Sequence, residues 1–398
     1  MARLSLAALL LAAGTGSFVA ASDLLYVTSY AGTITTLDLS ATSPAPNGGK
    51  VPVIKAVGSN QGCKPNPSWL TLNHAGGLLY CIDEGFAGPG GSLSAYRTHA
   101  DGSLEPLGKA ATPPGPVSGS FYGCKNRGFA VAHYGGSSFS TWDVSDPSNI
   151  KNLDNLNFTE PHGPKPEQTA PRPHETVLDP TGRFLIVPDL GTDLVRVFSF
   201  DSKSLQTTAL PPVQAKTGSG PRHVAFAVKG PKTFMYLITE LGNTIVGYEV
   251  TYEEKSIQFK EIFDIGVHGE GKPVPQSAAA SEIVVSADNK FLIATSRREN
   301  STTVPSFDDG STPINSDPII NFSIDDSTGK LNLLQDVAAG GYFPRHFSVN
   351  KAGTRVAVGM QKDGRVVVIK RDPASGMLGE FESFANIEGE ITSVIFDE

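Results

Sequence analysis

The sequence predicts an all-β protein, and three observations lead to this prediction. First, the 398 residues include 42 glycines and 29 prolines without a collagen-like period, and each Gly or Pro inside a helix would cost about 1–3 kcal/mol. Second, a unit of two strands joined by a tight turn recurs along the chain. Third, the two chain ends carry complementary parts of that unit. Together they predict a seven-bladed β-propeller, its ring closed by N- and C-terminal strands that share one blade.

Residues 1–21 have the pattern of a secretory signal peptide. Arg3 is followed by an apolar run over residues 4–13, and small residues lead up to Ala21. A bilayer span needs about 20 apolar residues, so this run is too short to cross a membrane. We therefore expect cleavage after Ala21, a secreted, extracellular protein, and a single propeller domain over residues 22–398.

Three Asn-x-Ser/Thr sequons agree with secretion. The expected glycosylation sites are Asn157, Asn300 and Asn321. Cys63, Cys81 and Cys124 allow one disulfide and leave one thiol over, and the sequence does not decide which two of them pair. One disulfide cannot cross-link a chain of this length into a stable fold, so we expect the packing of side chains to supply the stability.

Charge and motifs exclude several classes of partner. Asp and Glu (40) outnumber Lys and Arg (32), and the formal net charge of −8 gives no basic footprint for nucleic-acid binding. The chain has no Cys-x-x-Cys pair and no His-Glu-x-x-His motif, so we expect no metal site. No later apolar segment has the length of a membrane span.

The repeated unit is clearest over residues 173–187. An extended segment meets a turn at Asp179 to Gly182, and a second, mostly apolar strand follows at once. This is the pattern of a β-hairpin. Further copies start at Pro67, Pro221, Ser281 and Pro344, and a weaker copy starts near Phe121. Their spacing of roughly 50–60 residues is that of four-stranded propeller blades with variable loops.

The chain ends supply the seventh unit. Residues 24–27 and 33–39 resemble the second and third strands of a blade without a first, and residues 390–396 resemble a first strand with nothing after it. Joining them completes one blade and removes exposed sheet edges. Two stacked β-sandwiches, the alternative fold, would not explain these complementary halves.

Polar residues fill the two positions of each unit that meet at one end of the central channel. The start of the first strand lies beside the end of the second, so these positions gather together. The first column contains Ser68, His174, Arg222, Glu282 and Arg345, and the second contains Asp83, Asp189, Glu240 and Arg297, with His133 and Tyr134 in the weak unit. Variation from blade to blade is expected of a site built on a repeated scaffold. Salt links between blades are the alternative explanation.

Two groups of residues in these columns have simpler roles. Asp83 and Asp189 stand beside glycines, so we expect them to cap turns. His223 and His346 each follow an arginine by one residue, and alternation along a strand predicts that they point away from the channel face.

Several motifs together resemble the seven-bladed propeller lactonase family, which includes 6-phosphogluconolactonases and fungal 3-carboxy-cis,cis-muconate cyclases. The motifs are Pro173-His174, Gly220-Pro221-Arg222-His223, Thr239-Glu240-Leu241, Ser281-Glu282-Ile283, Ser296-Arg297 and Phe343-Pro344-Arg345. Asn66 to Leu70 and Ala132-His133-Tyr134 look most similar to the fungal members. The resemblance implies a catalytic set of His174, Glu240, Arg222 and Arg297 without metal or cofactor. We also expect His133, Glu282 and Arg345 to bind substrate.

The predicted function is hydrolysis, or formation as in a carboxymuconate cyclase, of the ester bond in an anionic sugar- or muconate-type lactone. Glu240 or His174 would act as general base or acid, and Arg222 and Arg297 would hold the anion and the developing oxyanion. The sequence contains no Gly-x-Ser-x-Gly elbow, so we do not expect a serine nucleophile. The alternative is a non-catalytic, secreted propeller that binds a cell-surface, cell-wall or matrix partner. A calcium-dependent lactonase is less consistent with the arginines of the first column.

Overall fold

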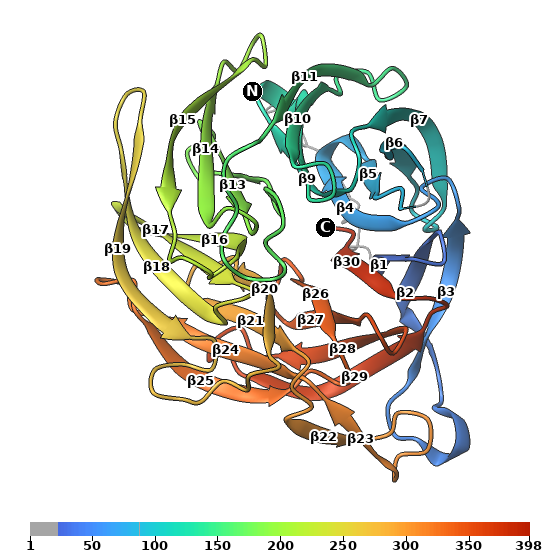
Figure 1. The fold of residues 1–398 in the computed structure, drawn as a ribbon. Helices are drawn as coiled ribbons and strands as arrows, with labels where there is room; N and C mark the ends of the chain where they lie inside the picture. The colour runs from blue at the N-terminus through green and yellow to red at the C-terminus, as the bar shows by residue number, and fades with distance from the viewer. Residues whose placement is uncertain (1–22, 87) are drawn as a thin grey trace, which may run out of the picture.

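The computed structural model describes residues 23–86 and 88–398, so the signal peptide predicted for residues 1–21 lies outside the described residues. The described chain forms a ring of antiparallel sheets around a central axis (Figure 1). Five sheets have four strands each, and an eight-stranded sheet combines two further blades. The predicted seven-bladed propeller is thereby confirmed. None of the helices in the described ranges is long and apolar enough to cross a membrane.

The two chain ends build one blade together, as predicted. Its strands, from the axis outward, are β30 (Ile391–Phe396), β1 (Leu24–Ser29), β2 (Thr33–Ser43) and β3 (Val53–Asn60). β30 pairs antiparallel with β1, with Val27 opposite Val394. A single parallel pair, Val53 with Phe384, links this blade to the last one and produces the eight-stranded sheet.

The other six blades follow in chain order. The next three contain β4 (Pro67–Asn73), β5 (Leu78–Asp83), β6 (Gly91–Thr98) and β7 (Leu104–Thr112); β8 (Pro116–Tyr122), β9 (Gly128–His133), β10 (Ser138–Asp143) and β11 (Lys151–Asn157); and β12 (Val177–Leu178), β13 (Phe184–Asp189), β14 (Leu194–Phe200) and β15 (Thr207–Gln214). The last three contain β16 (Pro221–Lys229), β17 (Lys232–Thr239), β18 (Thr244–Tyr252) and β19 (Ile257–Gly266); β20 (Ala279–Val285), β21 (Phe291–Arg297), β24 (Pro318–Ile324) and β25 (Leu331–Ala338); and β26 (Pro344–Val349), β27 (Arg355–Met360), β28 (Arg365–Arg371) and β29 (Leu378–Asn386).

Short additions decorate the ring. A separate hairpin of β22 (Thr302–Pro305) and β23 (Pro313–Ser316) is inserted between β21 and β24. Three short 3₁₀ turns, η1 (Pro46–Gly48), η2 (His74–Gly76) and η3 (Cys124–Asn126), complete the described elements. The first strands of neighbouring blades contact one another around the axis, as β26, β30, β4 and β8 do in succession.

The core lies between the faces of neighbouring blades. In one such layer, Phe184 and Ile186 of β13 pack with Met235 and Leu237 of β17, and all four are buried. Burying a side chain of this size contributes about 1.5–3 kcal/mol relative to leaving it in water. A ring of such layers explains how a large protein with one disulfide is held together.

The weaker repeat starts earlier than predicted. Its first strand, β8, begins at Pro116, and Phe121 lies near the end of that strand. The strand lacks an apolar side chain at Gly119, where an added Cβ would lie 2.4 Å from the ring of Phe129. This close packing removes the apolar pattern that would have revealed the strand.

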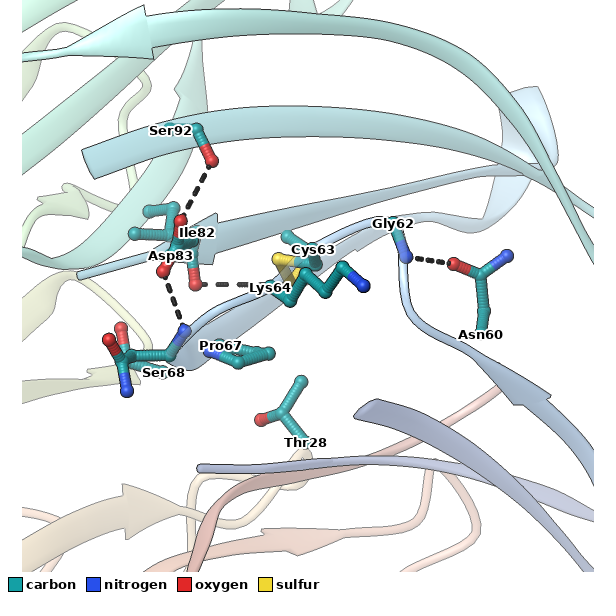
Figure 2. Close-up of a disulfide and its surroundings, with 12 residues drawn as sticks. Thr28, Asn60, Gly62, Cys63, Lys64, Pro67, Ser68, Ile82, Asp83 and Ser92 are labelled. Atoms are coloured by element: carbon teal, nitrogen blue, oxygen red, sulfur yellow. Dashed lines mark hydrogen bonds between the residues drawn. A yellow bond between two sulfur atoms is a disulfide. The ribbon is translucent and has the colours of Figure 1, made fainter. Parts of the chain in front are cut away.

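The disulfide joins Cys63 to Cys81, with Cα atoms 6.1 Å apart, and leaves Cys124 free and exposed. It ties the segment before β4 to the second strand of the same blade. Figure 2 shows that the disulfide lies beside the turn after β5, where the Asp83 carboxylate accepts hydrogen bonds from Asn66 N (2.8 Å) and Ser92 Oγ (3.2 Å). Asp83 Oδ1 also accepts from Gly85 N at 3.0 Å, which confirms its predicted turn-capping role.

The three sequons differ in exposure. Asn157 and Asn300 are exposed. Asn321, in contrast, is fully buried in β24, and its amide donates to Gly376 O at 2.6 Å. A glycan has no room at such a position, so the prediction that Asn321 is a glycosylation site is wrong for the folded chain. The sequon pattern takes no account of which face of the strand the asparagine occupies.

Candidate active site

A small cavity lies on the axis of the propeller, and every blade contributes a residue to its wall. The lining residues are Ser68, Trp69, Val117, His174, Arg222, His223, Glu282, Arg345, His346 and Thr392. Its volume of about 10 Å³ is room for about one water molecule. Of the predicted site residues, the structure therefore brings His174, Arg222, Glu282 and Arg345 to one place.

A β-bulge at the start of the first strand shapes this wall in four blades. The register shifts between Pro67 and Trp69, Pro116 and Ser118, Pro221 and His223, and Pro344 and His346. The extra residues are Ser68, Val117, Arg222 and Arg345, and each lines the cavity. A bulge interrupts the alternation of side chains and re-aims them.

The bulges overturn the prediction for two histidines. His223 and His346 both line the cavity beside the arginines that precede them. The alternation rule fails here because it holds only for a regular strand. His223 and His346 are therefore part of the site, together with Trp69, which follows the bulge in its own blade.

Arg222, Glu240 and Arg297 form an ion triad beside the cavity. Glu240 Oε2 accepts from Arg222 Nε at 3.0 Å and contacts Arg297 Nη2 at 2.8 Å. Arg297 also donates to the carbonyls of Ala279 and Ala280, at 3.1 and 3.2 Å. Burial would raise the pKa of Glu240, but the two guanidinium groups outweigh it and lower that pKa. Glu240 is thus held ionised between two arginines.

The two arginines of this triad are almost completely buried. Only 2% of Arg222 is exposed. Burial, together with the nearby Arg297 charge, lowers the pKa of Arg222 to about 10. Arg222 Nη2 has no hydrogen-bond partner among the described residues, so it can still donate to a ligand.

Three side chains in the wall of the cavity are connected by short polar contacts. Glu282 Oε1 lies 2.8 Å from His223 Nδ1, and His223 Nε2 lies 3.1 Å from His174 Nδ1. His174 has no partner at Nε2 within the described ranges, and its ring lines the cavity. Burial lowers the pKa of His174 and of His223 well below the usual value, and the positive charge of Arg222 adds to this effect.

Glu175 adds a second buried carboxyl to this group. It lies 3.6 Å from His223 Nδ1 and accepts a hydrogen bond from Val224 N at 2.7 Å. Burial raises the pKa of Glu175 well above its usual value, and the nearby Glu282 raises it further. Of the two carboxyls, Glu282 is the closer to His223 Nδ1, at 2.8 Å against 3.6 Å for Glu175.

Arg345 contacts a carboxylate and a tyrosine that come from two other blades. Its Nη2 lies 3.6 Å from Glu84 Oε1, which in turn accepts from the Tyr30 hydroxyl at 2.5 Å. Burial alone would lower the pKa of Arg345, but Tyr30, Glu84 and Glu240 outweigh it and raise that pKa. Arg345 remains a cation facing the cavity.

Aromatic rings fix the imidazoles and one arginine from the side. Trp69 makes edge contacts with His223 and His346, at 5.7 and 5.0 Å between ring centres. Tyr134 makes a similar contact with His174 at 5.6 Å, and Arg297 lies 4.9 Å over the ring of Phe343. These contacts limit rotation of the polar groups.

The pairing registers correct one column of the sequence analysis. Thr239 lies opposite Pro221, Asp83 opposite Pro67, and His133 opposite Pro116. The residues equivalent to Glu240 are therefore Glu84, one position later than the expected Asp83, and Tyr134, which the column already contained beside His133.

This shift explains why the structure does not bring His133 to the cavity. Its ring is buried between Pro113 O (3.1 Å) and Ser140 Oγ (2.7 Å). Asp189 occupies the same position in its blade. It accepts from Gly191 N and Arg172 N, as its predicted turn-capping role requires.

Comparison with known proteins identifies the family. A family model described as "Lactonase, 7-bladed beta-propeller" matches residues 24–396. The chain belongs to this seven-bladed propeller lactonase family. The sequence-based resemblance is thereby confirmed at the level of the family, and so is the prediction of a lactonase-type enzyme.

The proteins similar to this lactonase include fungal and bacterial ones. A protein of Arthroderma benhamiae named "Probable 6-phosphogluconolactonase" is 30% identical over 363 residues, covering 90% of this chain and 85% of the relative. The 6-phosphogluconolactonase of Formosa agariphila is 26% identical, covering 83% and 88%. The solved periplasmic gluconolactonase of Pseudomonas aeruginosa shares the fold, with a TM-score of 0.76 at 22% identity, covering 94% of this chain and 98% of that one.

Among the described residues, one cluster has the kind of donor atoms that could bind a metal ion. Ligand-type atoms of Glu175, His223 and Glu282 lie within 4.8 Å of one another. A metal there would have to replace the His223 Nδ1 hydrogen bond to Glu282 and would lie close to Arg222. The cluster is therefore better suited to hold a proton than a divalent cation.

Six further residues belong to the site although the sequence pattern does not indicate them: His223, His346, Glu175, Trp69, Glu84 and Tyr30. One signal was available for part of this set. A proline opens the first strand at Pro67, Pro116, Pro221 and Pro344, and prolines inside sheets are confined to strand starts, edges and bulges. The repeated Pro therefore marks the position where alternation stops.

Proposed function

We propose that this protein hydrolyses the ester bond of a small lactone that carries a carboxylate or phosphate group. The observation that carries the proposal is the wall of the cavity: Arg222 and Arg345 line it together with His174, whose Nε2 has no partner among the described residues. Arg297 is linked to Arg222 through Glu240. Guanidinium groups suit both a substrate anion and a developing oxyanion. An adjacent basic nitrogen suits activation of water.

The proposed reaction follows the usual course of ester hydrolysis. A water oxygen attacks the lactone carbonyl carbon while its proton moves to His174 Nε2. Negative charge builds on the carbonyl oxygen, which Arg222 Nη2 stabilises. The ring C–O bond then breaks, and the leaving alkoxide takes the proton from His174 to give a hydroxy acid.

Glu240 takes part by holding two arginines rather than by moving a proton. Its carboxylate is paired with Arg222 and Arg297. His174 Nε2, in contrast, has no hydrogen-bond partner among the described residues, and this favours His174 over Glu240 as the general base. Arg345, whose contact with Glu84 is long at 3.6 Å, is free to bind the substrate anion.

Acid release from 6-phosphoglucono-δ-lactone, glucono-δ-lactone and the lactone of 3-carboxymuconate tests the proposal. We expect acceleration with at least one anionic lactone, a lower kcat/KM for uncharged glucono-δ-lactone, and a large loss in Arg222→Ala and His174→Gln. No acceleration with any of the three, or unchanged rates in both variants, would overturn it. The family's cyclase chemistry would be indicated if 3-carboxymuconate were closed to its lactone instead.

We also propose that the protein is exported through its N-terminal residues 1–21. The Cys63–Cys81 disulfide supports this, because such bonds persist in oxidising compartments, and so does the exposure of Asn157 and Asn300. Expression of the full chain in a eukaryotic host followed by N-terminal sequencing is the test. Recovery from the medium beginning at Ser22 is expected, and retention in the cells with an intact N-terminus would contradict export.

A further inference from the structure

The geometry points to Glu282 and His223 as positioning residues that fix His174 in the tautomer with its proton on Nδ1, so that Nε2 is the proton acceptor. This inference rests on the proposed function for its catalytic meaning. The tautomer itself follows from the hydrogen bonds and has a test of its own.

Arg222 fixes the state of His223. Arg222 Nη1 lies 3.3 Å from His223 Nε2 and also donates to Ser281 O at 2.7 Å. A guanidinium group has donors and no acceptor. His223 Nε2 must therefore carry a lone pair rather than a proton.

The proton of His223 is then on Nδ1, where Glu282 receives it. Glu282 Oε1 accepts from His223 Nδ1 at 2.8 Å and from Ile283 N at 3.0 Å. The second hydrogen bond fixes the carboxylate relative to the strand. Because Glu282 is only 3% exposed, water does not compete for this oxygen.

His223 in turn fixes His174. Since His223 Nε2 is an acceptor, His174 Nδ1, 3.1 Å away, must donate to it. The lone pair of His174 is therefore on Nε2. Tyr134 at the edge of the ring and the backbone bond from His174 N to Pro188 O hold this orientation.

The surrounding charges allow this arrangement to work. The groups that face the two imidazoles are Arg222, Arg297, Arg345, Glu175, Glu282, Glu240 and His346. Burial raises the pKa of Glu282, and the nearby His346 and Arg222 oppose this effect. When His174 gains a proton from water, the Glu282 carboxyl stabilises the cation through the hydrogen bonds of His223. In serine hydrolases a buried carboxylate orients and supports the catalytic imidazole directly. Here the imidazole of His223 stands between the Glu282 carboxyl and His174.

Nitrogen NMR of the full-length protein labelled with ¹⁵N-histidine tests the tautomer without substrate. His174→Gln assigns the signal, which is expected to show a protonated Nδ1 and an unprotonated Nε2. In Glu282→Gln and His223→Ala, that signal should become a mixture of tautomers. A wild-type His174 protonated on Nε2, or a tautomer unchanged in both variants, would overturn the inference. Either result is independent of whether a lactone is hydrolysed.

Kinetics provide the second readout. Glu282→Gln and His223→Ala are expected to lower kcat about 10²–10⁴-fold with KM changed little, and imidazole should restore part of the rate of His223→Ala. His268→Gln, another buried histidine bonded to two carboxylates but remote from the cavity, is the matched control and should keep its rate. Full activity in Glu282→Gln would overturn the inference. So would activity lost in EDTA and restored by a divalent cation, which would place a metal at His223.

Discussion

Arg222 and His223 are neighbours in the chain, and Arg222 Nη1 nevertheless lies 3.3 Å from His223 Nε2. In a regular strand these two side chains would point to opposite faces. The bulge between Pro221 and His223 turns both into the axial cavity. One irregular residue thus brings a guanidinium group to the cavity and places it beside the imidazole that follows it in the chain.

Replacing Arg222 tests the first of these roles. Arg222→Ala should lower kcat/KM about 10³-fold, as expected when a transition-state donor is lost from a buried site. Arg222→Lys retains the charge without the planar fork and should recover only a small part of this loss. Initial rates with an anionic lactone are the measurement. Arg97→Ala, whose half-exposed side chain pairs with Glu105 on an outer strand, is the control, and an equal loss there would contradict the assignment.

The pH dependence should differ between free enzyme and complex. Burial lowers the pKa of His174 well below its usual value, and Arg222, His223, Arg345 and Arg297 contribute to the lowering. A bound anion neutralises the arginines and raises that pKa again. The acidic limb of kcat, which reports the complex, should therefore lie at a higher pH than the limb of kcat/KM, which reports the free enzyme. Coincident limbs would show that the anion does not bind near His174.

The scaffold could be predicted from sequence because it depends on local patterns repeated several times. Alternating strands, Asp-Gly turns and the split terminal unit each specify pairing, and their agreement in number fixed the blade count. The site could be predicted only in part. His174, Arg222, Glu240 and Arg297 occupy positions that the repeat itself aligns.

The rest of the site depends on departures from the repeat. The bulges that bring His223 and His346 to the cavity each change the register by one residue, and a one-residue shift reverses the face of every side chain beyond it. In the second column, counting along the chain selected Asp83 instead of Glu84, and it named His133 beside Tyr134 although only Tyr134 is equivalent to Glu240. Burial of Asn321 is likewise a property of packing between blades, which a three-residue motif does not encode.

Asn321 should behave as a structural residue. Asn321→Ala removes the bond to Gly376 O in a fully buried strand and should lower the free energy of unfolding by about 1–3 kcal/mol. Asn157→Ala, at an exposed strand end, is the control and should change stability by less than about 0.5 kcal/mol. Denaturant unfolding measures both. Mass spectrometry of protein secreted from a eukaryotic host should find glycan at Asn157 or Asn300, and glycan at Asn321 would contradict the burial.

The disulfide should stabilise its blade. Cys63 and Cys81 are separated by 18 residues, and closing a loop of that size contributes about 3 kcal/mol through the unfolded chain. Cys63→Ser is expected to lower stability by about this amount, whereas Cys124→Ser should leave it unchanged because Cys124 is free and exposed. Unfolding curves with and without reductant provide the comparison. A wild type insensitive to reductant after full reduction would contradict this account.

His268 should make stability depend on pH at a place remote from the cavity. Its Nδ1 lies 2.7 Å from Asp336 and its Nε2 3.1 Å from Glu299. Burial would lower the pKa of His268, but the bonds to Asp336 and Glu299 outweigh it and raise that pKa to about 9. Because the folded pKa exceeds the unfolded value of about 6.5, this stabilisation is complete below pH 6.5 and is lost as pH rises through 9. His268→Gln should therefore cost about 1–2 kcal/mol at pH 6, allowing for solvent screening at the partly exposed Asp336, and almost nothing at pH 10. Thermal unfolding of both proteins at the two pH values is the measurement, and a difference that does not change with pH would show that His268 is neutral in the folded protein.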